Sequence, residues 1–158
     1  MRILVVEDSP TAALALRRRL EEMGLTVVVA KNGREGWEHL QKQHEWVVIT
    51  DWMMPEMDGP DLCRRIRAQK NVPYTYVIIM TMKDLRKDRF EGLKAGADDF
   101  LTKPPDVIEL ATALETARRI TTAMAQLHNR VRELEASVEK PEEASLEPAE
   151  ITAASLFG

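Results

Sequence analysis

The chain has 158 residues, of which 44% are hydrophobic and 30% charged, and its formal net charge is −4. This length is enough for one domain with a full hydrophobic core plus a further segment. The acidic balance argues against nonspecific nucleic-acid binding, the single cysteine excludes a disulfide framework, and no apolar run reaches membrane-spanning length.

The N-terminal stretch MRILVVEDSP meets acidic residues after the short apolar run ILVV. Such a run is too short for the hydrophobic region of a secretory signal, so we expect a cytoplasmic protein without membrane contact. The only cysteine, Cys63, falls in a helical pattern and is expected to be a small buried hydrophobe.

The first strand is predicted at residues 3–6, which are continuously apolar. Ser9 and Pro10 then supply an N-cap and a first-turn proline for a helix, which Gly24 ends. A second apolar and β-branched run predicts a strand at residues 25–30.

The alternation continues through the middle of the chain. Asn32 and Gly33 turn the chain into a second helix, and WVVIT predicts a third strand at residues 46–50. A third helix is expected around Leu62, and YVIIM predicts a fourth strand at residues 76–80.

A fourth helix is predicted around Phe90 and ends at Gly96, and DDFLT predicts a short fifth strand at residues 98–102. Strands separated by helices indicate βαβ units and a parallel sheet. The strands are continuously apolar, as expected when both faces of a sheet are buried. We therefore predict an α/β fold with a doubly wound five-stranded parallel sheet and helices on each side.

Polar side chains stand at the ends of four predicted strands. Glu7 and Asp8 follow the first, Asp51 the third, Thr81 the fourth and Lys103 the fifth. The carboxyl ends of parallel strands lie at one edge of the sheet, which is where ligands bind in such folds. The sequence therefore predicts one cluster of three carboxylates, a hydroxyl and an ammonium group.

Three neighbouring carboxylates repel one another and favour either protonation or the binding of a cation. Oxygen ligands without histidine or cysteine favour a hard ion such as Mg²⁺, which also bridges to phosphate. An aspartate carboxylate can attack a phosphoryl group, and a lysine and a hydroxyl can stabilise the transferred charge. Phosphoryl chemistry is therefore the expected use of this cluster.

Four motifs, VVEDSP, VVITDWMMPEMDG, VIIMTMKD and AGADDFLTKP, make residues 2–117 resemble the response-regulator receiver domains of bacterial two-component signalling. The resemblance implies a flavodoxin-like, CheY-like sheet with strand order 2-1-3-4-5. It also implies a phosphorylation-dependent switch rather than a turnover enzyme, with a histidine kinase or phosphotransfer protein as its phosphodonor.

The resemblance assigns a role to each residue of the cluster. Asp51 is the phosphoacceptor and a Mg²⁺ ligand, Glu7 and Asp8 form the acidic pair around Mg²⁺, and the backbone carbonyl of Met53 is the remaining protein ligand. Thr81 is the switch hydroxyl that bonds a phosphoryl oxygen.

Two further roles follow from the same resemblance. Lys103 pairs with another phosphoryl oxygen, and the bond from Lys103 to Pro104 is expected to be cis. Phe100 is the switch aromatic that rotates inward when Thr81 moves.

Two features leave alternatives open. Met82 stands where the family usually has a small residue, so it either slows the hydrolytic water and lengthens the phosphoryl lifetime or folds away from the site. Ala12, Ala15 and Arg19 lie off the core face of the first helix, where they form either a docking surface for the kinase or an ordinary solvent face.

Two other classes of function compete with the switch. In an aspartate-nucleophile phosphohydrolase similar to the haloacid dehalogenase group, a second aspartate stands two residues after the nucleophile, and here that position is Met53. The second competing class is a structural protein, in which a receiver-like fold serves only to present a coiled coil. Receivers that have lost their signalling role usually lack part of the acidic cluster, and this chain retains all of it.

A heptad pattern continues past the expected receiver, at Leu110, Ala113, Ala117, Ile120, Met124, Leu127, Val131, Leu134 and Val138. We expect its part from Ile120 onward to form a parallel coiled-coil homodimer in which Arg130 pairs with Glu135 across the two chains. The alternative is a single helix whose apolar stripe packs back on its own domain.

The expected organisation is a receiver domain at residues 1–119, a helical extension at 120–140 and an acidic segment at 141–158. Pro141 is expected to end the helix. The last segment is either a flexible tail or the start of a further domain. It leaves no room for a helix-turn-helix, so no nucleic-acid partner is expected for this chain.

Overall fold

The computed structural model describes residues 1–82 and 86–139. Within them the chain forms a single parallel sheet, with neighbouring strands in the order β2-β1-β3-β4-β5. Its strands are β1 (Arg2–Val6), β2 (Thr26–Ala30), β3 (Val47–Asp51), β4 (Tyr76–Thr81) and β5 (Asp99–Thr102). The predicted doubly wound α/β fold and its strand order are confirmed.

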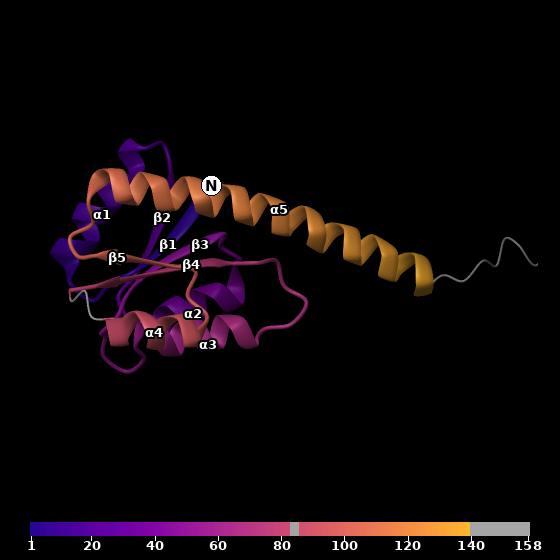
Figure 1. The fold of residues 1–158 in the computed structure, drawn as a ribbon, viewed down its shortest axis with the longest axis horizontal. Coiled ribbons are helices and arrows are strands. Elements are labelled where there is room, and N and C mark those ends of the chain that lie inside the picture. Colours follow the sequence, from indigo (N-terminus) through magenta and orange to yellow (C-terminus); the bar gives the residue numbers. More distant parts are fainter. Residues whose placement is uncertain (83–85, 140–158) are drawn as a thin grey trace, which may run out of the picture. The chain divides into compact units, whose positions relative to one another are not determined.

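Helices cover both faces of this sheet (Figure 1). They are α1 (Pro10–Glu22), α2 (Gly33–Lys42), α3 (Gly59–Ala68), α4 (Arg86–Ala95) and α5 (Val107–Glu139). One core lies between the sheet and the helices α1 and α5, and it includes Leu16, Leu20 and Leu110. A second core lies on the other face and includes Leu40, Leu62 and Ile66. The strands carry apolar residues on both sides because each side faces a helical layer.

Local sequence explains where the helices begin and end. The side chains of Ser9, Asn32 and Asp58 each accept a hydrogen bond from a backbone N–H in the first turn of α1, α2 and α3. Gly24 takes a left-handed φ of +82° directly after α1, where a residue with a Cβ would be strained. These caps confirm the helix starts and the stop predicted at Ser9, Asn32 and Gly24.

Two strands end one residue later than predicted, and β3 also begins one residue later. Asp51 is the last residue of β3, since it continues the ladder opposite Met80, and Thr81 is the last residue of β4, opposite Thr102. The strand register therefore holds both polar residues inside the sheet rather than in the loops that follow it.

The chain divides into a compact unit at Met1–Ala125 and a second unit that begins at Gln126, with α5 contributing to both. Of the heptad positions, Leu110, Ala113 and Ala117 are buried in the first core. Later positions are exposed to between 44% and 77%, namely Leu127, Val131, Leu134 and Val138. The helix end predicted at Pro141 and the segment 141–158 lie outside the described residues.

In the part of the chain that the structure describes, no helix combines the length and the apolarity needed to cross a membrane.

Candidate functional site

The carboxyl ends of the strands bring together three carboxylates that are far apart in the sequence. Glu7 and Asp8 directly follow β1, and Asp51 ends the adjacent strand β3. One carboxylate oxygen from each of the three lies within 4.8 Å of the others. The pairing of β1 with β3 is what places them side by side.

Lys103 reaches this cluster from the end of β5. Its Nζ lies 2.9 Å from Oδ2 of Asp51 and 2.5 Å from Oε2 of Glu7. The backbone N–H of Lys103 donates to the carbonyl of Thr81 (3.0 Å), which fixes the lysine beside the end of β4. The peptide bond from Lys103 to Pro104 is cis, as the resemblance implied.

The charges in the cluster shift each other's protonation. Burial raises the pKa of Glu7, an effect that the Lys103 ammonium and the N–H of Ser9 partly offset and the charge of Asp51 reinforces. Burial alone lowers the pKa of Lys103, but its hydrogen bonds to Glu7 and Asp51 outweigh this, so the pKa is raised. Lys103 therefore remains an ammonium ion throughout the physiological pH range.

The donor set suits a hard divalent cation. Glu7, Asp8 and Asp51 offer only oxygen ligands, and one ammonium group does not neutralise three carboxylates. Mg²⁺ prefers such carboxylate ligands and keeps several of its waters. The residues present therefore fit the metal that the sequence predicted.

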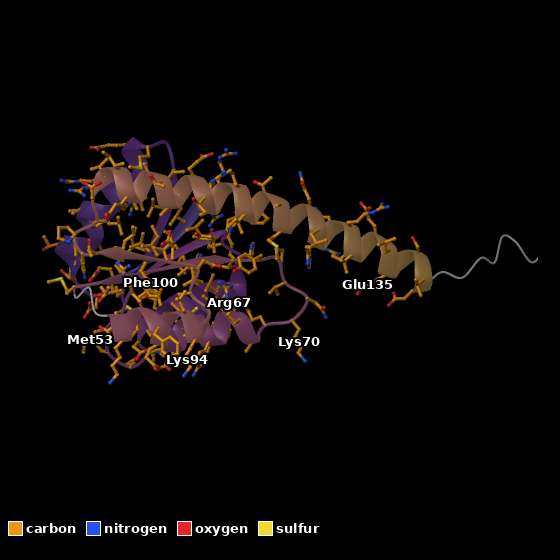
Figure 2. All side chains as sticks on the ribbon, in the orientation of Figure 1. Met53, Arg67, Lys70, Lys94, Phe100 and Glu135 are labelled. Atoms are coloured by element: carbon orange, nitrogen blue, oxygen red, sulfur yellow. The ribbon has the colours of Figure 1, made fainter. Side chains whose placement is uncertain are left out.

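The loop after β3 forms one side of an open cavity beside Asp8. Trp52, Met53, Met54, Pro55 and Asp58 line it together with that aspartate. The side chain of Met53 is 77% exposed and stands at the carboxyl edge of the sheet (Figure 2). The Met53 carbonyl thus belongs to the loop that borders the carboxylates, and its role as a metal ligand stays a prediction.

The predicted switch residues take different places around this edge. Thr81 is 5% exposed at the end of β4, and Phe100 is half-buried on β5 against the second core. Met82, by contrast, is 75% exposed. Control of water access by Met82 therefore stays a prediction.

The residues predicted for kinase docking line a small cavity between α1 and the loop after β5. Ala12, Ala15 and Arg19 contribute to its wall together with Lys103 and Pro105. Nη1 of Arg19 donates to the carbonyl of Pro105 (2.8 Å). This contact ties α1 to the lysine loop, and the sequence contains no local signal for it because the two residues are 86 positions apart.

Residues 3–115 match the family described as the response regulator receiver domain. The chain belongs to this family. Its members are signalling proteins that histidine kinases or phosphotransfer proteins phosphorylate, rather than enzymes that turn over a separate substrate. Receiver domains bind Mg²⁺ at an acidic pocket, and the carboxylates of this chain form a candidate for it.

Curated relatives share this receiver and are longer than the chain. Response regulator MprA of Mycolicibacterium vanbaalenii is 37% identical over 123 residues, which cover 77% of this chain and 52% of the relative. Transcriptional regulatory protein QseB of Escherichia coli O157:H7 is 39% identical over 126 residues, which cover 79% of this chain and 56% of the relative. This chain therefore spans about half the length of these relatives. Because several relatives are named as transcriptional regulators, the expectation that no nucleic acid is involved finds no support.

Solved receiver domains have the same fold. The Francisella response regulator 1452 receiver domain superimposes with a TM-score of 0.69 at 35% identity, covering 75% of this chain and 98% of that one. The signal receiver domain of an HD domain-containing protein from Pseudomonas fluorescens Pf-5 superimposes with a TM-score of 0.71 at 28% identity, covering 77% of this chain and 97% of that one. The similarity to these solved domains thus covers about three quarters of this chain and nearly the whole of each solved domain.

Proposed function

We propose that this receiver is a phosphorylation-dependent switch in which Asp51 accepts a phosphoryl group from a histidine kinase or phosphotransfer protein. The observation that carries the proposal is the contact between Oδ2 of Asp51 and Nζ of Lys103 beside two further carboxylates. A carboxylate held at a strand end next to a fixed positive charge is suited to attack phosphorus, since the lysine stabilises the oxygens that gain charge.

Each residue of the site has its own role in phosphoryl transfer. A carboxylate oxygen of Asp51 forms the new bond to phosphorus as the bond from phosphorus to the donor's histidine nitrogen breaks. Glu7, Asp8, Asp51 and the carbonyl of Met53 would hold Mg²⁺, which supplies charge neutralisation between the carboxylates and the phosphoryl oxygens. Lys103 binds one phosphoryl oxygen.

The response to phosphorylation involves the end of β4 and β5. Thr81 binds a phosphoryl oxygen, and Phe100 changes its packing as Thr81 moves. Thr81 and Phe100 lie on neighbouring paired strands, which supports this coupling. The surface of α4, β5 and α5 then changes the partners it binds or the geometry of a dimer. Ala12, Ala15 and Arg19 on α1 are proposed as the docking surface for the phosphodonor.

Dimerisation through α5 is part of this proposal. From Leu127 onward the heptad positions are exposed in the single chain, so they are available to a second copy. In a parallel pair, Arg130 faces Glu135 of the partner, and the apolar a and d positions meet in the seam. Arg130 here pairs with Glu133 on its own exposed surface at 3.4 Å, a weak contact that a partner can replace.

Intact mass after incubation with Mg²⁺ and acetyl phosphate tests the acceptor directly. The wild type should gain one phosphoryl group and Asp51→Asn none, because the amide does not attack phosphorus. Asp61→Asn is the matched control, since Asp61 is an exposed aspartate on α3 whose ion pair with Arg64 lies on the surface. An adduct of equal yield on Asp51→Asn would contradict the proposal.

A further inference from the structure

Helix α4 presents small residues to the rest of the domain. Among residues 87–95, whose side chains the structure describes, Gly92 and Ala95 are the buried ones. The large apolar residues of the same stretch point outward, since Phe90 is 60% and Leu93 56% exposed. The position of α4 is therefore set by what packs against its small residues rather than by large side chains of its own.

Two aromatic rings from other elements meet at Gly92. A Cβ built on this glycine would lie 2.5 Å from both Cε1 and Cζ of Phe100 and 3.1 Å from Cζ3 of Trp52. Phe100 belongs to β5, and Trp52 directly follows β3. The backbone of α4 at Gly92 thus lies against the tip of Phe100 and close to the edge of Trp52, with no room for a methyl group between them.

Trp52 is fixed to the site at its other end. It follows Asp51 in the chain and lines the cavity beside Asp8. The backbone N–H of Trp52 donates to the carbonyl of Met80 (2.9 Å), and the carbonyl of Trp52 accepts from the backbone N–H of Gly59 (2.8 Å). These two bonds fix the backbone from which the indole projects, so the position of the ring at Gly92 is set by the geometry of the segment directly after Asp51.

We propose that Gly92 is a positioning residue through which α4 senses the state of Asp51 by a second route, from Trp52 directly to the helix. This inference rests on the proposed function, because it concerns how the phosphorylated site acts on α4. The first route runs from Thr81 to Phe100, and both routes end at the same glycine. A helix without large anchors can adopt two positions, and the two rings select between them.

The two routes can be tested separately by a variant that lacks the first one. In Thr81→Ala the hydroxyl route is absent, but Trp52 still contacts Gly92, so α4 should keep a response to phosphorylation. In the double variant Thr81→Ala/Gly92→Ala the added methyl displaces the rings, so the response of α4 should disappear. Leu93→Ala is the matched control in the same helix, because its exposed side chain is next to the glycine in sequence.

Fluorine NMR of the full chain with 4-fluorophenylalanine at position 90 alone reports on α4. Phe100 and Phe157 stay unlabelled, so that no fluorine enters the contact between the tip of Phe100 and Gly92. Spectra are recorded with Mg²⁺, before and after acetyl phosphate, while intact mass gives the fraction phosphorylated in each variant.

We expect Thr81→Ala to keep at least half of the wild-type shift of the Phe90 resonance per phosphoryl group, and the double variant to keep less than a tenth. Loss of the Phe90 shift in phosphorylated Thr81→Ala, or its persistence in the double variant, would overturn the inference. If the wild type shows no mass adduct, the proposed function itself fails, which this design distinguishes from a missing second route.

Single variants supply an independent reading. Gly92→Ala alone should move the ring-proton resonances of the unlabelled Phe100 before phosphorylation, because the ring has to leave the space that the methyl takes. Trp52→Leu in the Thr81→Ala background should abolish the Phe90 shift without any change to α4. An unmoved Phe100 resonance in Gly92→Ala, or an intact Phe90 shift in the Trp52 variant, would count against the inference even if one of the variants folds poorly.

Discussion

Cys63 shows how burial controls a single side chain in this domain. It lies fully buried on α3, and burial raises the pKa of its thiol from the ordinary value of 9.0 to about 11. The folded thiol therefore stays protonated at neutral pH, and thiol reagents should modify it only after unfolding. A reaction of the native protein with Ellman's reagent as fast as that of the urea-unfolded chain would contradict this.

The raised pKa of Cys63 also affects stability at alkaline pH. The unfolded thiol loses its proton near pH 9 and the folded one near pH 11, so the stability linked to this group is present below pH 9 and falls as pH rises. Between pH 7 and pH 10 the loss should be about 1 kcal/mol. Urea unfolding of the wild type and Cys63→Ala at both pH values measures it, and the gap between the two proteins should narrow at pH 10.

Met82 is the residue whose effect on chemistry is most open to test. It follows the proposed switch threonine and is 75% exposed at the rim of the site. If it shields the phosphoryl group from water, Met82→Ala should shorten the phosphoryl lifetime several-fold, as measured by loss of the mass adduct after removal of acetyl phosphate. Met23→Ala serves as the control on a distant exposed methionine, and an unchanged lifetime in Met82→Ala would favour a side chain that folds away.

At the scale of elements, a buried carboxylate ties three segments together at the end of the sheet opposite the site. Glu45, which is 0% exposed between α2 and β3, accepts from Arg2 of β1 at 2.7 Å and lies 2.8 Å from Nε2 of His39 on α2. Thr75 also donates to its backbone carbonyl at 2.9 Å. No local pattern in the sequence points to Glu45, because its partners are brought together only by the fold.

Removal of the Glu45 carboxylate should therefore lower the free energy of unfolding more than removal of a surface carboxylate does. Glu45→Ala leaves Arg2 and His39 without their buried acceptor, and we expect a loss of about 3 kcal/mol in the free energy of unfolding. Glu21→Ala is the matched control, because its ion pair with Arg17 is about half exposed and should contribute less than about 1 kcal/mol. Equal midpoints of urea unfolding for the two variants would contradict the assignment.

At the scale of the whole molecule, the heptad pattern of α5 serves two purposes along one helix. Its first positions fill the domain's own core, and its later ones are exposed. The change of environment occurs near the end of the compact unit, where Thr121 is still buried and Ile120 is 38% exposed. A coiled coil between two copies can therefore begin only beyond the heptad positions that are buried in the receiver core.

Leu134→Asp tests this dimer because it places a charge at a d position of the seam. Multi-angle light scattering should show a dimer for the wild type and at least a tenfold weaker association for the variant. Asn129→Asp adds the same charge at an outward-facing position and should leave the dimer intact. A monomeric wild type at all concentrations tested would remove dimerisation through this segment.

The sequence by itself determined the fold and the inventory of the site. Continuous apolar strands, capped helices and polar residues at four strand ends fix a parallel sheet with one acidic edge, because periodicity and end signals are local properties of the chain. The tertiary structure alone decided the contacts made across the fold. The meeting of Trp52 and Phe100 over Gly92, the tie from Arg19 to Pro105 and the burial of Glu45 join residues distant in sequence. Such contacts depend on how packed elements fit together, and no local pattern encodes that fit.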